Sequence, residues 1–246
     1  MKIEICCGDY ESMLSAVEGG AERIELCAGL SEGGLTPSLG LIRAAVKLNI
    51  PQINVLIRPR KGDFCYTQRE LALMKEEIKI AVAEGATGIV SGALTPEGDI
   101  DMGALLQLRE AAPKTRFTFH RAFDLCADPM KSLQEIMTVG CTTLLTSGQA
   151  NSALAGAPLI RQLVEKAAGR IEIMAGSGIT SSNVEEVVDA TGVRAVHTSA
   201  RKPVESAMTF RKGDVNMGKP GDNEYTRLIT SADEVASVIK KVRNRQ

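Results

Sequence analysis

The chain has 246 residues, and 29 Lys and Arg residues against 30 Asp and Glu residues give a formal net charge of -1. With 44% hydrophobic and 24% charged residues, the composition is typical of one globular domain and argues against disorder or a nucleic-acid partner. The sequence contains no apolar run near the roughly 20 residues that cross a bilayer, and no signal-peptide core follows Lys2, so we expect a cytoplasmic protein without a membrane partner. In that compartment its six cysteines are expected to be reduced thiols.

Short aliphatic or β-branched runs alternate with longer helical patterns along the chain. The expected strands cover Lys2–Cys6, Arg23–Leu26, Gln52–Ile57, Gly88–Val90, Arg116–Phe119, Thr143–Leu145, Arg170–Met174 and Ala195–His197. The expected helices cover Tyr10–Glu18, Ser38–Leu48, Gln68–Glu84, Asp101–Glu110, Pro129–Thr138, Pro158–Ala167, Asn183–Ala190 and Ala232–Val242. Thr67 with Glu70, Ser182 with Glu185, and Ser231 with Glu234 have the spacing of capping boxes.

Strict strand–helix alternation requires right-handed crossovers and produces a parallel sheet. Eight such units in about 250 residues match the size of a (β/α)8 barrel. We therefore expect a single TIM-barrel domain over residues 1–246. The alternative is a doubly wound open sheet, but Cys7-Gly8-Asp9 is not the Gly-rich turn that usually follows its first strand. Residues 202–230 depart from the regular spacing and are expected to form a lid or a disordered loop.

Acidic and sulfur-containing residues alternate with aliphatic residues in three of the expected strands. Ile3-Glu4-Ile5-Cys6 and Ile24-Glu25-Leu26-Cys27 share this pattern, and Ile171-Glu172-Ile173-Met174 repeats it. Because the aliphatic face of a barrel strand must meet the helices, the acids and sulfurs are predicted to point into the lumen. Buried carboxylates need partners, and the cations available at strand ends are Arg23, Arg58, Arg60 and Arg121. We expect Glu4 or Glu25 to pair with Arg58 or Arg121. A charged interior that only fixes packing is the alternative to a functional one.

Charged residues at the carboxyl ends of barrel strands are typical of an active site. Glu4, Glu25 and His120 are the candidate acid–base groups, and Arg58, Arg60 and Arg121 are candidate anion clamps. His120 could equally be a metal ligand, or a packed histidine bonded to a neighbouring carboxylate. His197, near the end of the eighth expected strand, is a weaker candidate.

The loops after the seventh and eighth expected strands favour an anion site. Glycines there let the backbone approach a phosphate, although a Gly-Ser-Gly turn is also simply a tight loop. The candidate anion-binding residues are Ser147, Gly176, Ser177, Gly178, Ser199 and Arg201.

Cys6 and Cys27 occupy equivalent positions on neighbouring expected strands, which lie about 4.8 Å apart. Two soft thiolates suit Cu(I) better than a tetrahedral zinc site. The alternative is that both are small buried hydrophobic residues, because free cysteine is among the most buried residue types. Cys7 has the opposite parity and is expected to face the helices.

Several motifs, in order from Met1 to about Arg201, closely resemble the CutC family, which is named for copper homeostasis. They are Ile3-Glu4-Ile5-Cys6, Gly20-Ala21-Glu22-Arg23-Ile24-Glu25-Leu26-Cys27, Gly33-Gly34-Leu35-Thr36-Pro37-Ser38, Ile57-Arg58-Pro59-Arg60-Lys61-Gly62-Asp63-Phe64, Thr118-Phe119-His120-Arg121-Ala122-Phe123-Asp124, Leu145-Thr146-Ser147-Gly148 and Gly176-Ser177-Gly178-Ile179. The resemblance implies a cytoplasmic (β/α)8 barrel that is usually oligomeric, is linked to copper tolerance and binds Cu(I) through cysteine. We expect a homo-oligomer, with a dimer favoured. The sequence departs from the family pattern at Ala175 and after Arg201.

Two functions stay open at this point. The first is a copper-homeostasis protein that binds Cu(I) through Cys6 and Cys27. The second is a barrel enzyme of unknown reaction that acts on a small anionic substrate bearing phosphate or carboxylate. The Arg, Glu and His residues at the strand ends favour the second function, and the family resemblance favours the first.

Overall fold

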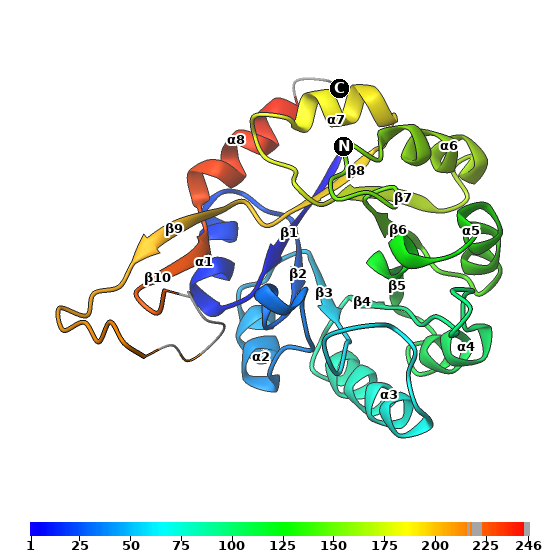
Figure 1. Ribbon diagram of the computed structural model, residues 1–246, viewed down its shortest axis with the longest axis horizontal. Coiled ribbons are helices and arrows are strands. Elements are labelled where there is room, and N and C mark those ends of the chain that lie inside the picture. Colours follow the sequence, from blue (N-terminus) through cyan, green and yellow to red (C-terminus); the bar gives the residue numbers. More distant parts are fainter. Residues whose placement is uncertain (216, 218–222, 244–246) are drawn as a thin grey trace.

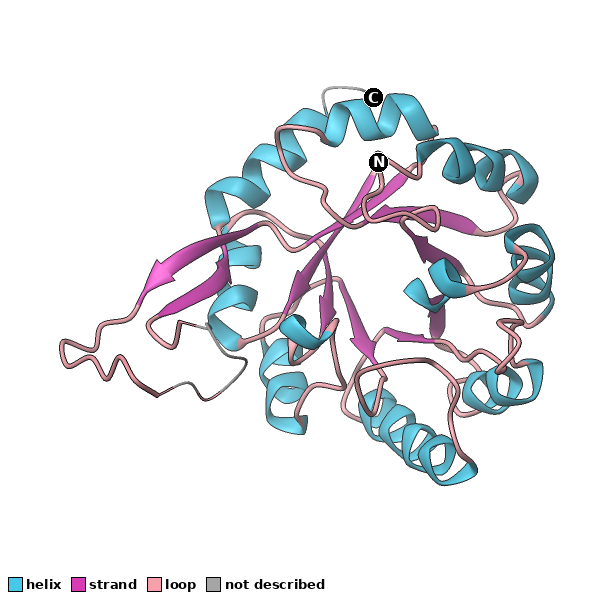
Figure 2. Cartoon of the chain, in the orientation of Figure 1, coloured by secondary structure: helices cyan, strands magenta, loops and turns pink. Residues whose placement is uncertain are grey.

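A computed structural model describes residues 1–215, 217 and 223–243. Over these residues, eight parallel strands close into a barrel in the order β1 to β8, and the helices surround it (Figure 1, Figure 2). The first strand pairs with both the second and the eighth, which closes the sheet. The predicted (β/α)8 TIM barrel is therefore confirmed, and the open sheet is excluded.

The observed elements follow the predicted ranges closely. The strands are β1 (Lys2–Cys7), β2 (Arg23–Leu26), β3 (Gln52–Leu56), β4 (Gly88–Ser91), β5 (Arg116–Phe119), β6 (Thr143–Thr146), β7 (Glu172–Gly176), β8 (Ala195–Thr198), β9 (Arg201–Glu205) and β10 (Thr226–Thr230). The helices are α1 (Tyr10–Glu18), α2 (Leu39–Lys47), α3 (Gln68–Ala83), α4 (Met102–Glu110), α5 (Pro129–Thr138), α6 (Ala157–Ala167), α7 (Val184–Thr191) and α8 (Ala232–Arg243), with short 3-10 helices at Leu30–Glu32 and Arg121–Leu125.

Hydrogen bonds at the helix starts explain where several helices begin. Thr67 and Glu70 form the predicted capping box at the start of α3. The box predicted at Ser182 is wrong, because α7 begins after Asn183, whose side chain bonds the backbone of Thr180 and Gly178. Glu234, expected to cap α8, directs its carboxylate to Ser181 and so ties α8 to the loop before α7.

The alternation along each strand divides the core into an outer and an inner part. Outward side chains such as Ile5 and Ile24 join the main apolar core with the helices, and Cys7 lies there as predicted. Inward side chains form small apolar clusters: Cys6, Cys27, Leu56 and Val90 in one, and Leu145, Met174 and Ala195 in another. The lumen is therefore filled by side chains, and its remaining positions are polar.

The segment after β8 leaves the barrel as a hairpin. β9 and β10 pair antiparallel and project to one side of the ring of helices (Figure 1). The base of the segment 202–230 is thus a two-stranded sheet, while residues 216 and 218–222 lie outside the described residues. A lid role for this segment stays a prediction.

None of the helices in the described part of the chain is long and apolar enough to cross a membrane.

Candidate functional site

A cavity of about 830 Å³ opens at the carboxyl ends of the barrel strands. Cys6 and Glu25 line it from β1 and β2, Arg58 and His120 from the ends of β3 and β5, and Arg201 from β9. This is the face on which barrel enzymes build their sites, because loops from every strand end meet there.

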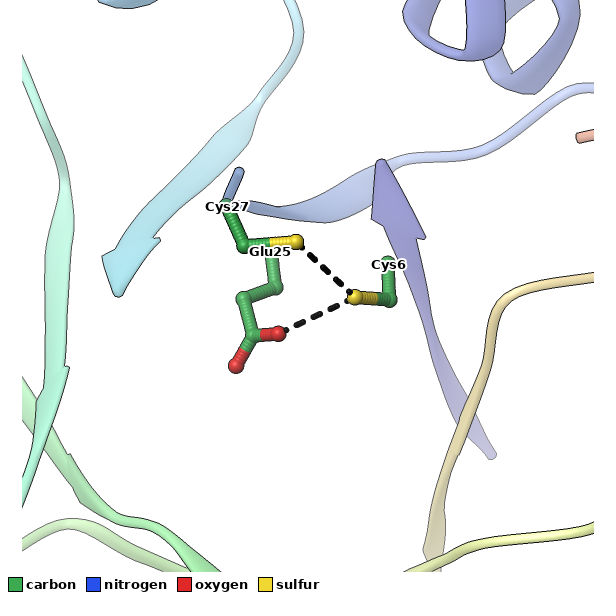
Figure 3. Close-up of side chains that lie close together, drawn as sticks. All are labelled: Cys6, Glu25 and Cys27. Carbon is green, nitrogen blue, oxygen red and sulfur yellow. Dashed lines mark hydrogen bonds between the residues drawn. The ribbon is translucent and has the colours of Figure 1, made fainter. Parts of the chain in front are cut away.

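Two thiols and one carboxylate lie close together (Figure 3), and Cys6 and Glu25 of this cluster line the cavity. The Sγ atoms of Cys6 and Cys27 are 3.6 Å apart, and Cys6 Sγ donates a hydrogen bond to Glu25 Oε2 at 3.2 Å. Cys27 is fully buried, and Cys6 and Glu25 are 4% and 5% exposed. The three donor atoms lie within 4.8 Å of one another, which makes the cluster a candidate metal centre.

The strand register explains how the cluster forms. Cys6 on β1 is the register partner of Glu25 on β2, so both inward side chains start from the same level of the barrel. Cys27 comes two residues after Glu25 and therefore points to the same side. The predicted inward orientation of both acids and both sulfurs agrees with these contacts.

A charged network lies below the cluster. Arg23 bridges two carboxylates, with Nε 2.7 Å from Glu4 Oε2 and Nη1 2.7 Å from Glu172 Oε1. Glu4 is fully buried and also accepts a hydrogen bond from Asn54 Nδ2 at 2.5 Å. Its Oε1 lies 2.8 Å from His197 Nδ1, and His197 Nε2 lies 3.9 Å from Glu25 Oε2. The network therefore runs from the amino-terminal end of the barrel to Glu25, the carboxylate of the candidate metal centre.

The two buried carboxylates differ in their ease of ionisation. Burial works against ionisation of Glu4, but the charge of Arg23 and the contact with His197 prevail and lower its pKa to about 2. Burial raises the pKa of Glu25, and His197 offsets this only in part. The hydrogen bond with Cys27, together with burial, raises the pKa of the Cys6 thiol well above its ordinary value. Glu4 is therefore a fixed anion, whereas Glu25 and Cys6 retain protons more readily.

The predicted ion pairs to Arg58 and Arg121 are wrong. The Arg58 guanidinium donates to the backbone carbonyls of Glu32, Gly34 and Gly62, and Arg121 pairs with Asp124 at 2.7 Å. Arg23, which lies on the strand next to Glu4, takes their place. Its side chain reaches Glu4 because neighbouring strands bring the two residues to the same layer of the lumen.

His120 lies in the wall of the cavity rather than beside a carboxylate. Its Nδ1 accepts a hydrogen bond from Ala122 N, and its ring packs edge-on against Phe64. Burial, reinforced by the charge of Arg58, lowers the pKa of His120 to about 3, so the ring is neutral at physiological pH. With Nδ1 as an acceptor, the proton resides on Nε2, which is buried and has no partner among the described residues.

The expected anion loops border the cavity, and an acidic side chain lies beside them. Ser177, Gly178, Ser199 and Arg201 line it as expected. Ser177 has a left-handed φ of 87°, and its hydroxyl donates to Asn151 O. Close to this loop, the Glu234 carboxylate accepts hydrogen bonds from Ser181 N and Oγ at 2.7 and 2.9 Å. A carboxylate of the protein itself therefore uses donors that an external anion would otherwise use.

The other candidate residues have separate roles. Arg60 pairs with Glu70 and Asp63. Ser147 Oγ accepts a hydrogen bond from Arg121, and Asp124 and the Ala150 carbonyl are the two acceptors within reach of its single proton. Gly176 is the last residue of β7. Thus the structure brings together Cys6, Cys27, Glu25 and, through His197, Glu4, and it gathers Arg58, Arg121, His120 and Arg201 around the cavity above them.

Known proteins match this chain along nearly all of its length. The model of the CutC family matches residues 1–202. The chain is 41% identical over 245 residues to a family protein CutC of Bacteroides thetaiotaomicron, covering 99% of this chain and 98% of that protein. It is 44% identical over 238 residues to the human copper homeostasis protein cutC homolog, covering 96% of this chain and 87% of that protein. This chain belongs to the CutC family.

Solved structures place the CutC chain in the same fold. The CutC structure from Streptococcus agalactiae superposes with a TM-score of 0.77 at 34% identity, over 81% of this chain and 98% of that one. An aldolase at 15% identity superposes with a TM-score of 0.58 over 81% of this chain and 89% of that one, which reflects the shared barrel alone.

Two residues near the site were not predicted to have the role that the structure gives them. His197 connects Glu4 with Glu25, and the alternation along β8 carried a signal for it, because outward Val196 requires His197 to point inward. Glu234 lies in the first turn of α8, and nothing in the local pattern distinguishes it from a helix-capping acid.

Proposed function

We propose that this protein acts in cytoplasmic copper homeostasis and holds Cu(I) between the thiolates of Cys6 and Cys27. The observation that carries the proposal is the 3.6 Å separation of the two sulfur atoms, beside a cavity that Cys6 lines. Soft thiolates select Cu(I) over harder ions, and both cysteines are buried. The name of the human relative, a copper homeostasis protein, supports the same assignment.

The test compares Cu(I) binding by the wild type and the Cys6→Ser/Cys27→Ser double variant. Competition with a Cu(I) chelator of known affinity under anaerobic, reducing conditions should show one ion bound per chain in the wild type and none in the variant. A hydroxyl is a hard, poorly ionised ligand, which is why serine cannot replace the thiolate. Cys7→Ser is the matched control, because Cys7 is the neighbouring buried thiol on the outward face of β1. Equal copper extraction by the wild type and the double variant would refute the proposal.

A second candidate function is an enzyme that acts on a small anionic substrate. The cavity of about 830 Å³ is large enough for a metabolite, and Arg58, Arg121 and Arg201 lie in its wall. Glu25 and His120 would be its polar reacting groups. A screen of phosphorylated and carboxylated metabolites for turnover tests this function, and His120→Ala should then lower turnover about 100-fold.

We also propose that the chain forms a homo-oligomer, with a dimer favoured. Met208 and Phe210, on the segment that joins β9 to β10, are 57% and 70% exposed, and Leu228 on β10 is 54% exposed. A second copy that covers these side chains would remove apolar surface from water. Sedimentation velocity of the wild type and of Phe210→Ser provides the test, and a monomeric wild type would refute it.

A further inference from the structure

We propose that Glu25 is a third metal ligand beside Cys6 and Cys27, which makes the cluster a site for a divalent ion of the zinc type with a fourth position open to the cavity. This inference rests on the proposed function only in that it uses the same two thiols. It adds a ligand and a second class of metal.

The distances between the donor atoms favour this coordination. With Zn–S bonds of about 2.3 Å and Zn–O bonds of about 2.0 Å, a tetrahedral ion separates two sulfurs by about 3.8 Å and a sulfur from an oxygen by about 3.5 Å. The observed separations are 3.6 Å between the sulfurs and 3.2 Å from Cys6 Sγ to Glu25 Oε2. A linear complex with bonds of the same length would separate the sulfurs by about 4.6 Å. These two separations are close to the edges of a tetrahedron, and the third pair of donor atoms, Cys27 Sγ and a Glu25 oxygen, lies within 4.8 Å. Linear coordination requires the thiols to move apart.

The chemistry of the donors points the same way. Thiolates bind both Cu(I) and zinc, but a carboxylate is a hard ligand that contributes little to Cu(I) and suits a divalent ion. Three protein ligands with one open position are typical of zinc sites that bind water or a substrate oxygen.

Residues outside the cluster hold Glu25 in position. His197 Nε2 lies 3.9 Å from Glu25 Oε2, and Glu4 fixes the other ring nitrogen at 2.8 Å. Glu4 is in turn bound by Arg23. Metal sites commonly use outer residues to orient their ligands, and loss of one member weakens metal binding by 10- to 100-fold. Here hydrogen bonds fix Glu4 and the imidazole, and the imidazole faces Glu25 at ion-pair range.

The open position faces the cavity. Cys6 and Glu25 both line it, while Cys27 is fully buried and is not among the lining residues. An ion held by the three residues is thus accessible to a small ligand that enters from the carboxyl-end face. The rim carries Arg58 and Arg201, so an anionic oxygen is the kind of ligand that this position would accept.

The test uses Co2+ as a spectroscopic probe for zinc, with the full chain under anaerobic, non-chelating reducing conditions. The wild type should bind one Co2+ per chain, with thiolate-to-cobalt charge-transfer absorption and the intense visible bands of tetrahedral cobalt, and Zn2+ should displace it. Glu25→Gln should weaken Co2+ and Zn2+ binding by about 100-fold or more. The same variant should change Cu(I) affinity less than about threefold, because an amide replaces a ligand that Cu(I) hardly uses. Glu172→Gln is the matched control, since it removes an inward acid bonded to Lys2 and Arg23 instead of the thiol cluster.

Each result decides between the proposals. Failure of the wild type to bind Co2+ or Zn2+, or unchanged affinity in Glu25→Gln, overturns the role of Glu25 and leaves Cu(I) binding intact. Loss of Cu(I) binding in Glu25→Gln also overturns it, because Glu25 would then serve the copper site. If Glu25→Gln does not fold, X-ray absorption on the zinc-loaded wild type provides the answer. Two sulfur and two oxygen or nitrogen neighbours are expected, and a shell without sulfur would contradict the inference.

Discussion

Nδ1 of His197 lies 2.8 Å from Oε1 of Glu4, so two residues from neighbouring strands at the closure of the barrel are joined in its lumen. Glu4 is fully buried, and Arg23 holds its second oxygen. The contact fixes the orientation of the imidazole and directs Nε2 toward Glu25. His197 therefore stands between two carboxylates, one permanently charged and one that readily keeps a proton.

Removal of the Glu4 charge should destabilise the protein strongly. In Glu4→Gln the buried Arg23 guanidinium loses one of the two carboxylates that lie 2.7 Å from it, and we expect a loss of about 3–5 kcal/mol in the free energy of unfolding. Urea denaturation measures this change. Lys2→Ala, which removes a 55% exposed partner of Glu172, should cost less than about 1 kcal/mol. Similar losses in the two variants would show that the lumen network does not contribute to stability.

The pKa values of the two histidines should lie on opposite sides of the ordinary value of about 6.5. Burial keeps His120 neutral, with a pKa of about 3. Burial also disfavours protonation of His197, but the charges of Glu25 and Glu4 outweigh it and raise its pKa. Because the chain has two histidines, NMR spectra of the imidazole protons should show one signal that is constant from pH 5 to 8 and one that titrates above 6.5. His120→Gln assigns the constant signal, and two ordinary titrations would contradict the described environments.

These shifts also set the pH dependence of stability. Between pH 3 and 6.5 the unfolded state binds a proton at His120 that the folded state does not, so stability falls as pH falls, by up to about 1.4 kcal/mol per pH unit. His197 has the opposite sign: its contribution is fully present below 6.5 and is lost as pH rises through its raised pKa. Urea denaturation at several pH values should show a flatter acid limb for His120→Gln than for the wild type. An equally steep limb would place the acid sensitivity elsewhere.

Anion binding near the loop after β7 should respond to Arg201 and Glu234 in opposite ways. Arg201→Ala should weaken the binding of inorganic phosphate about tenfold, since a charged hydrogen bond is lost. Glu234→Gln should strengthen it, because the carboxylate that now accepts from Ser181 disappears. Arg60→Ala should have no effect, as Arg60 is engaged by Glu70 and Asp63. Calorimetric titration at two salt concentrations gives the affinities, and binding should weaken as salt rises. Equal affinities in all variants would remove the anion site from this loop.

Gly156 should tolerate no larger residue. A Cβ atom there would lie 1.9 Å from Ser147 O, where the backbone of the loop after β6 passes the start of α6. Gly156→Ala should therefore destabilise the protein by about 1–3 kcal/mol or more. Gly103→Ala, within α4 and with an ordinary 3.5 Å contact to Asp101, should be neutral or stabilising by up to about 1 kcal/mol. Thermal unfolding of both variants tests the pair, and equal melting temperatures would contradict the described contact.

Alternation of side chains was enough to predict the barrel and the inward direction of Glu4, Cys6, Glu25 and Cys27. Each of these predictions depends on one strand at a time, and the pleat of a strand is a local property. Partner choice was predicted less well. Arg58 and Arg121 lie after the ends of their strands, whereas Arg23 lies at the start of its strand. Only the register between neighbouring strands shows which of these guanidinium groups lies level with Glu4. The link from α8 to Ser181 depends on helix docking, which no local pattern encodes.

The Arg23 network determines whether an ion can pass along the axis of the barrel. Arg23 and the carboxylates of Glu4 and Glu172 occupy the lumen between the thiol cluster and the amino-terminal end. Among the described residues, Met1, Lys2 and Glu172 help to line a second hollow at the amino-terminal end, on the other side of this ionic network. The cavity beside Cys6 is therefore closed at its amino-terminal end, so any ion that enters it must leave through the same opening. Delivery and removal of a metal ion then share one opening. A protein that donates the metal and a protein that accepts it cannot use opposite ends of this barrel, as they could in a channel.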